Sequence, residues 1–200
     1  GIINVVNGAH DTVNFICDDP RIKAVSFVGS NPAGEHIAAR AGKNFKKVQC
    51  NMAAKNNGIF MPSADKEASI TQLVSAFAGG SGQRCMALTV AIFVGAETQS
   101  WIPEVVSRAK TIRSGPGADF GPLITCQAKT RIQKILDDSV AMGAELLLDG
   151  MSPDHIPAAF KGGNWMDPTV MKIDMKKMGI NAAGLKNIPV YQNELFGPGL

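Results

Sequence analysis

Apolar runs of strand length alternate with helical patterns along most of this chain, and that alternation limits the folds open to it. The runs stand at residues 3–8, 24–30, 46–50, 58–62, 88–95 and 144–150. Amphipathic patterns with a period near that of an α-helix separate several of them. Strands that alternate with helices at this spacing form parallel sheets covered by helices. We therefore predict an α/β fold, in which residues 24–30 form a buried strand.

Residue types that favour helix ends mark the helical segments. A side-chain oxygen before an apolar pattern favours a helix start, and glycine favours a helix end. The expected helices run from His10 to Cys17, from a cap at Ser30 to Gly42, from a cap at Ser63 to Gly79, from a cap at Thr98 through Ala109, and from about Thr125 through Val140. The part of the chain after Gly150 is rich in loops.

The bulk properties describe a globular chain and exclude two classes of partner. Its 20 basic and 17 acidic residues give a net charge of +3, and the basic ones are scattered without interleaved aromatic residues, so we expect no nucleic acid. No apolar run approaches the roughly 20 residues that a membrane helix needs. Because the chain opens on an apolar run without a Met, we expect it to be an internal fragment.

The cysteines form no metal-binding pattern. The four of them are widely separated, with no C-x-x-C pair and no nearby histidine to complete a zinc set. The pattern therefore predicts no metal site, and free thiols in a reducing compartment.

Cys85 stands in the stretch GGSGQRCMAL, residues 79–88, and two interpretations of it are open. A thiol becomes a useful nucleophile where positive charge stabilises its thiolate, and Arg84 supplies a charge that is not lost. The glycines also let the backbone approach a bound reactant. The alternative is that the glycines end a helix and Cys85 packs into the core, as free cysteines often do.

The other cysteines are weaker candidates. Cys17 precedes two aspartates whose charge disfavours a thiolate. Cys50 alternates with Val48 in an expected strand, which places it in the core. Cys126 follows a helix cap without a basic neighbour. No histidine stands in a cysteine-protease signature.

Six stretches in this order resemble the aldehyde dehydrogenase superfamily: SFVGSNPAG, VQCNMAAKN, GQRCMAL, DFGPLIT, WMDPTV and NELFGP. The sequence GQRCMAL is similar to that of the methylmalonate-semialdehyde dehydrogenase branch. The resemblance covers nearly the whole chain and is weakest at 151–157 and 174–191. It implies that residues 1–53 are the end of a Rossmann-type NAD-binding domain and that residues 54–200 belong to an α/β catalytic domain.

The resemblance also implies roles for individual residues. Cys85 falls on the catalytic cysteine that attacks the aldehyde. Gly29 and Ser30 fall on the turn that faces the NAD pyrophosphate, at a helix N-terminus where an anion is favoured. Glu194 matches the glutamate that holds the nicotinamide ribose. Lys55 matches a lysine to which we assign a mainly structural role.

Asn51 is the most informative departure from the general pattern. Most members of the superfamily have a glutamate there, which activates the water that hydrolyses the thioester. An amide takes up no proton near neutral pH, so the thioester should live longer and coenzyme A should intercept it. This implies an acyl-CoA product. Arg84 is then a candidate to bind the carboxylate of a semialdehyde substrate in two-pronged fashion.

The implied activity is the NAD-dependent oxidation of methylmalonate or malonate semialdehyde to acyl-CoA, in valine and pyrimidine catabolism. The branch implies a homo-oligomer, in the mitochondrial matrix of a eukaryote or otherwise in the cytoplasm. Two departures, Ala53 for a glycine and Asn193 for an acidic residue, leave room for a non-catalytic truncated paralogue that pairs with a full-length subunit. A hydrolysing aldehyde dehydrogenase is the third possibility. We expect the 200-residue segment to be inactive as a dehydrogenase by itself.

Overall fold

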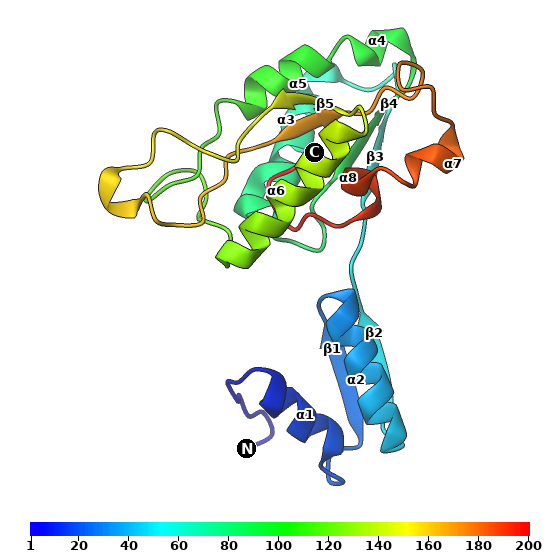
Figure 1. Ribbon diagram of the computed structural model, residues 1–200, viewed down its shortest axis with the longest axis vertical. Coiled ribbons are helices and arrows are strands. Elements are labelled where there is room, and N and C mark those ends of the chain that lie inside the picture. Colours follow the sequence, from blue (N-terminus) through cyan, green and yellow to red (C-terminus); the bar gives the residue numbers. More distant parts are fainter. The chain divides into compact units, whose positions relative to one another are not determined.

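The computed structural model describes residues 1–200 and divides into two compact units. Unit 1 spans Gly1–Ala54, and unit 2 spans Lys55–Leu200 (Figure 1). The assignment of these parts to a NAD-binding and a catalytic domain stays a prediction. No helix combines the length and the apolar composition that crossing a bilayer requires.

Unit 1 pairs two parallel strands with two helices. Its elements are α1 (His10–Asp18), β1 (Ala24–Val28), α2 (Asn31–Lys43) and β2 (Lys47–Asn51). β1 and β2 run parallel, with Ala24 opposite Lys47 and Val28 opposite Asn51. Parallel strands need a crossover between them, and α2 supplies it. Its small core contains Cys17, Ile37 and Ala41, against which Phe27 and Val48 pack.

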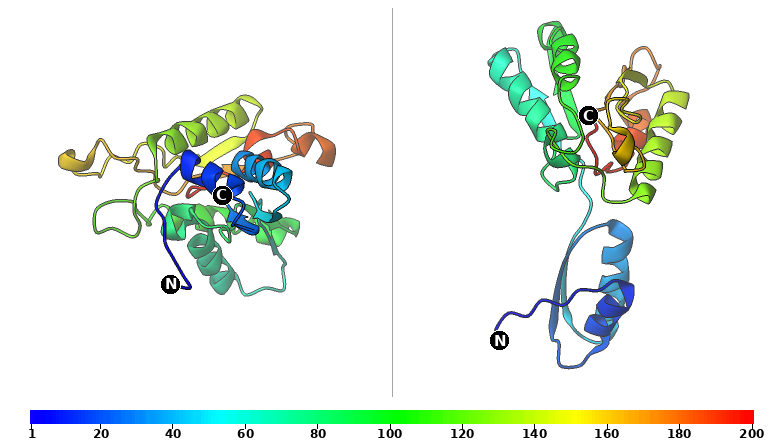
Figure 2. Two further views of the ribbon diagram at one scale, coloured as in Figure 1. Left: turned by 90° about the horizontal axis from the view of Figure 1, so that it is seen from below. Right: turned by 90° about the vertical axis from the view of Figure 1, so that its left-hand side faces the viewer.

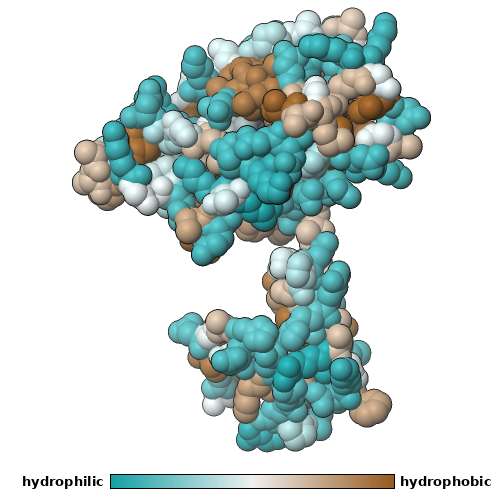
Figure 3. Space-filling view, in the orientation of Figure 1, coloured by the Kyte–Doolittle hydropathy of each residue, from teal (hydrophilic) through white to brown (hydrophobic).

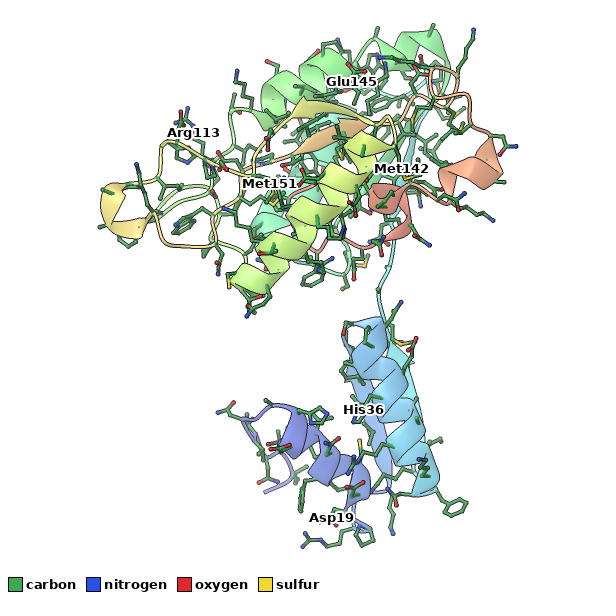
Figure 4. All side chains as sticks on the ribbon, in the orientation of Figure 1. Asp19, His36, Arg113, Met142, Glu145 and Met151 are labelled. Atoms are coloured by element: carbon green, nitrogen blue, oxygen red, sulfur yellow. The ribbon has the colours of Figure 1, made fainter.

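Polar contacts hold α1 against α2. His36 lies on α2 (Figure 4), and Nε2 of its ring lies 2.7 Å from Oδ1 of Asn14 on α1. Arg40 forms a two-pronged ion pair with Asp18, with Nε to Oδ1 at 2.9 Å and Nη2 to Oδ2 at 2.6 Å. The buried ammonium group of Lys46 donates to the main-chain oxygens of Asp19 and Ile22, which ties the connection before β1 to the start of β2.

Unit 2 contains two further strand pairs. Its strands are β3 (Asn57–Phe60), β4 (Val90–Phe93), β5 (Glu145–Leu148) and β6 (Val170–Lys172). Its α-helices are α3 (Lys66–Ala78), α4 (Gly95–Gln99), α5 (Ile102–Ala109), α6 (Cys126–Ala141), α7 (Ala182–Leu185) and α8 (Pro189–Gln192), and two 3₁₀ turns are η1 (Gly79–Gly82) and η2 (Ala158–Phe160). β3 and β4 are parallel, whereas β5 and β6 are antiparallel.

Two hydrophobic clusters fill unit 2. In the first, the apolar faces of α3 and α5 pack against each other and against Phe60 and Phe93, whose rings stack at 5.2 Å. In the second, Ile132 and Leu136 of α6 pack with Leu195 and the start of α8. α6 accordingly lies on the opposite side of the unit from α3 and α5 (Figure 2). On the surface, hydrophobic side chains gather where α5 and β5 lie (Figure 3).

The α/β prediction is confirmed. The expected parallel sheet is present as two separate parallel pairs, β1–β2 and β3–β4, whereas β5 and β6 are antiparallel. Two predictions about strands are wrong. Residues 1–8 form no strand, because no neighbouring strand supplies hydrogen bonds and their apolar side chains are exposed. Val28 is 69% exposed, so the strand at 24–28 is buried on only one face.

Two predicted helix caps also differ. The cap of α3 is Asp65 and not Ser63, because the Asp65 carboxylate reaches the N–H of Ala68 at 2.7 Å. Thr98 is fully buried inside α4, where its hydroxyl donates to the main-chain oxygen of Val94. The Ser63 prediction failed because Asp65 stands two positions later, and the Thr98 prediction failed because α4 already begins at Gly95 and α5 begins only at Ile102.

Candidate active site

The predicted site residues of unit 1 gather at the carboxyl ends of β1 and β2. Gly29 directly follows β1, and its N–H donates to the main-chain oxygen of Asn51 at 3.1 Å. Ser30 follows at the N-terminus of α2. The carboxyl ends of parallel strands, next to helix N-termini, are where ligands bind in open α/β sheets. Gly29, Ser30 and Asn51 therefore form a candidate ligand-binding edge of unit 1.

The N-terminus of α2 suits a phosphate group. Ser30 occupies the N-cap position without making a capping hydrogen bond from its side chain, and no acidic residue stands in the first turn. The free N–H groups and dipole of a helix N-terminus attract anions. This donor set fits the pyrophosphate of a dinucleotide such as NAD, and the role itself stays a prediction.

The alanine at position 53 does not strain the backbone. The residues other than glycine that have positive φ are Phe45, Ser81 and Phe196, so Ala53 lies outside the left-handed region. Its N–H donates to Oδ1 of Asn31 at 3.0 Å. The conformational cost that an added Cβ would carry in a left-handed turn therefore does not arise here.

Cys85 lies in an exposed turn behind a left-handed bend of unit 2. α3 ends at Ala78, and Gly80, Ser81 and Gly82 then take φ values of 60°, 53° and 63°. This bend reverses the chain into the turn that carries Cys85, where the N–H of Ala87 donates to the main-chain oxygen of Arg84 at 3.1 Å. The thiol of Cys85 is exposed, so the alternative that it packs into the core is excluded.

The guanidinium of Arg84 turns back over the end of α3. Its Nη2 donates to the main-chain oxygens of Ser75 and Ala76, both at 3.0 Å. These oxygens belong to the last turn of the helix, whose carbonyl groups attract positive charge. Arg84 therefore ties the Cys85 turn to α3. Its predicted role in substrate binding stays a prediction.

Asn56 holds the other side of the same turn. Its Nδ2 donates to the main-chain oxygen of Cys85 at 2.7 Å and to that of Ala87 at 2.9 Å. Its own main-chain oxygen accepts from the N–H groups of Thr89 at 3.2 Å and Val90 at 3.1 Å, where β4 begins beside β3. The turn is thus fixed both from α3 and from the start of β3.

Glu194 is held by the residues around it. Arg131 on α6 donates to the main-chain oxygens of Glu194, at 2.9 Å, and Leu195, at 2.5 Å. The chain after Leu195 then pairs with β6 through Thr169 and Leu200. Lys55 donates to the main-chain oxygen of Asn193 at 3.0 Å. Lys55 and Asn56 are adjacent, so one short segment contacts both the loop that carries Glu194 and the Cys85 turn.

Burial lowers the pKa of Lys55 from its ordinary 10.5 to about 8, although the charge of Glu194 opposes this shift. Between these two pH values the unfolded chain binds more protons than the folded chain, so the Lys55 contribution to stability rises with pH. We expect the unfolding free energy of the wild type, relative to Lys55→Met, to increase between pH 8 and 10.5. Urea unfolding at several pH values measures this, and Lys55→Arg, charged throughout, should show no such increase.

The remaining cysteines differ from Cys85 in their surroundings. Cys17 is fully buried, and burial first and the charge of Asp18 second raise the pKa of its thiol. Cys50 is partly buried, with its Sγ 3.5 Å from the main-chain oxygen of Gly34. Cys126 is exposed at the start of α6, which Thr125 caps through the N–H of Ala128. Cys126 is therefore the natural internal comparison for Cys85.

Sequence reasoning missed Asn56 and Arg131. Both act on main-chain oxygens of residues far along the chain, and a periodicity or charge pattern carries no signal for such contacts. The one available signal for Asn56 was its place directly before a strand, next to the lysine of the VQCNMAAKN stretch.

Comparison with known proteins agrees with this geometry. The profile of the aldehyde dehydrogenase family matches residues 1–199. A mouse protein named methylmalonate-semialdehyde/malonate-semialdehyde dehydrogenase [acylating], mitochondrial, is 48% identical over 202 residues, covering 99% of this chain and 35% of the mouse protein. Its human counterpart is 46% identical over 202 residues, covering 99% of this chain and 35% of the human protein. The chain thus spans about a third of the length of the curated relatives it matches.

Solved structures give the same result. A protein of Sinorhizobium meliloti described as a methylmalonate-semialdehyde dehydrogenase, complexed with NAD, has a TM-score of 0.87 and 35% identity, covering all of this chain and 39% of that one. The methylmalonate-semialdehyde dehydrogenase of Oceanimonas doudoroffii has a TM-score of 0.86 and 34% identity, covering 98% of this chain and 38% of that one. The chain belongs to the aldehyde dehydrogenase family.

Proposed function

We propose that the protein of which this sequence is a part oxidises methylmalonate or malonate semialdehyde with NAD and transfers the acyl group to coenzyme A. The observation that carries this is the combination of an exposed Cys85 with an asparagine at position 51. The names of the relatives, which include the word acylating, support the same chemistry. A hydrolysing enzyme would need a base at position 51 that an amide does not supply.

The proposed reaction begins with the Cys85 thiolate. Its sulfur adds to the aldehyde carbonyl and gives a tetrahedral thiohemiacetal, whose oxyanion needs hydrogen-bond donors. The N–H groups of Cys85 and Met86 donate no hydrogen bond within the chain, so both are open to that oxyanion. NAD held by Gly29, Ser30 and Glu194 would supply the hydride acceptor, and an acyl thioester would then remain on Cys85. The thiol of coenzyme A then takes the acyl group and releases Cys85.

Arg84 is the proposed partner of the substrate carboxylate. A guanidinium beside the nucleophile suits a semialdehyde that carries a second, charged end. The hydrogen bonds from Nη2 to the end of α3 use one edge of the group, and neither Nη1 nor Nε donates a hydrogen bond within the chain. The part of the guanidinium that points away from α3 is therefore the part that this proposal assigns to the substrate.

The branch also supports proposals about the cofactors, the location, the pathway and the assembly. NAD and coenzyme A are the proposed cofactor and co-substrate, with Gly29, Ser30 and Glu194 as the residues that hold NAD. The relatives named mitochondrial support the mitochondrial matrix as the location in a eukaryote. The proposed pathway is valine and pyrimidine breakdown, and the proposed assembly is a homo-oligomer.

The fate of the thioester tests the role of Asn51. A p-nitrophenyl ester of propionate acylates Cys85 directly and so bypasses the hydride step. We expect the acyl group to pass to coenzyme A much faster than to water, with propionyl-CoA as the product. We expect Asn51→Glu to raise hydrolysis by about 10²-fold, the lower end of what general-base catalysis contributes. Mass spectrometry of Cys85 and chromatography of propionyl-CoA measure the two outcomes.

Asn51→Gln is the matched control, because it keeps an amide of similar polarity and should leave hydrolysis slow. Fast hydrolysis by the wild type, unchanged by coenzyme A, would favour a hydrolysing dehydrogenase. A Cys85 that never carries an acyl group would favour the non-catalytic paralogue.

A further inference from the structure

Three main-chain oxygens of the Cys85 turn accept hydrogen bonds, whereas two of its N–H groups donate none. Residues 84, 85 and 87 each have a bonded main-chain oxygen: that of Arg84 accepts from the Ala87 N–H, and those of Cys85 and Ala87 accept from the Asn56 amide. The N–H groups of Cys85 and Met86 have no partner within the chain. The turn therefore has fixed oxygens at Arg84, Cys85 and Ala87 and two N–H groups that remain available as donors.

This arrangement fixes the direction of the open donors. A peptide unit is planar and trans, so its N–H points opposite to its carbonyl oxygen. The bond from Asn56 to the Cys85 oxygen thus sets the direction of the Met86 N–H. The bond between Ala87 and the Arg84 oxygen sets that of the Cys85 N–H in the same way.

We propose that Asn56 is the positioning residue of the nucleophile turn, which it orients so that the N–H groups of Cys85 and Met86 face the oxyanion formed on Cys85. This inference rests on the proposed thioester chemistry and deepens it. Asn56 reaches no reacting atom itself, because both of its amide hydrogens are used on main-chain oxygens. Its own main-chain oxygen, bonded to Thr89 and Val90, anchors it at the start of the β3–β4 pair.

Two reactions of the Cys85 thiol distinguish an effect on the orientation of the oxyanion donors from an effect on the accessibility of the thiol. In acylation by p-nitrophenyl propionate, the Cys85 sulfur forms a bond to the ester carbon, and nitrophenolate leaves with its electron pair after a tetrahedral oxyanion has formed. In alkylation by iodoacetamide, the sulfur displaces iodide and no oxyanion forms. Replacing a residue that orients oxyanion donors should slow the acylation and leave the rate of alkylation unchanged.

We expect Asn56→Ala to slow acylation of Cys85 about 10-fold to 100-fold, the range expected when an oxyanion donor is misplaced. Alkylation of Cys85 should change less than about 3-fold, since it needs only an exposed thiolate. Asn57→Ala is the matched control: this neighbouring amide is exposed and donates only to the main-chain oxygen of Lys55. Peptide mass spectrometry follows both reactions, with the exposed Cys126 as the internal reference.

Equal rates in the wild type and in Asn56→Ala would overturn the inference, and so would an equal fall in both reactions. Circular dichroism at the assay temperature checks that the variant is folded. If Asn56→Ala unfolds, Asn56→Ser keeps one donor and should give an acylation defect smaller than 10-fold with alkylation unchanged, and no defect would again overturn the inference. Failure of the proposed function would give a different result. The Asn56 substitution would still slow acylation of Cys85, but coenzyme A would not release the acyl group.

Discussion

Replacing Cys85 with serine should remove acyl transfer by this chain. A serine hydroxyl stays protonated near neutral pH, whereas a thiol yields a thiolate that is a far better nucleophile. We expect the rate of acylation by p-nitrophenyl propionate to fall at least roughly 10³-fold, because the nucleophile itself is lost. Release of nitrophenolate and the mass of the Cys85 peptide measure this change. The side chain is exposed, so the substitution should leave the fold intact.

Cys126→Ser is the matched control for this prediction. Cys126 is the other exposed cysteine, and it also lies in unit 2, at the start of α6. Its loss should leave acylation unchanged, because the proposal assigns the acyl group to Cys85 alone. If Cys85→Ser retains the wild-type rate, Cys85 is not the nucleophile and the proposed function falls with it.

The regular elements of this chain were open to prediction because local periodicity determines them. The apolar face of α3, built from Ile70, Leu73, Val74 and Phe77, is buried as its spacing indicates. β1, α2 and β2 appear in order because an apolar run, an amphipathic pattern and a second run leave one compact arrangement, with parallel strands around a crossover helix. The strand predicted at residues 3–8 failed because a strand also needs a partner, which sequence pattern alone does not supply.

The roles of the candidate site residues stay predictions from the resemblance, and the geometry around them could not be predicted from the sequence. The local chemistry around Cys85 left both a nucleophile and a core cysteine open, and only the resemblance and the exposed turn favour the nucleophile. The sequence could not predict the hydrogen bonds from Arg84 to the end of α3 or from Asn56 to the Cys85 turn. Each depends on main-chain oxygens that only the fold brings close. Gln83 is a similar case: it connects the turn to Pro122 and Ile124 through its amide.

Gly82→Ala should produce the largest loss of stability in unit 2. Gly82 has a φ of +63°, and a Cβ placed on it would lie 2.1 Å from the main-chain oxygen of Gly197 and 2.8 Å from that of Phe77. Both neighbours are backbone atoms, which cannot rotate away. Left-handed strain and overpacking each cost about 1–3 kcal/mol, so we expect the free energy of unfolding to fall by roughly 3–5 kcal/mol. Urea unfolding followed by tryptophan fluorescence measures it, since Trp101 and Trp165 are both buried in unit 2.

Gly117→Ala separates the two parts of that cost. Gly117 has a φ of +72°, but no atom lies within 4 Å of its added Cβ, so only the conformational cost of about 1–2 kcal/mol should appear. If both variants lose the same stability, the contact between Gly82 and Gly197 is not the constraint that we describe. If Gly82→Ala loses much more, the bend before Cys85 is locked to the segment after Glu194 through these two glycines. The nucleophile and the proposed ribose-binding carboxylate would then be held in register by backbone packing, which no side-chain motif in either stretch reveals.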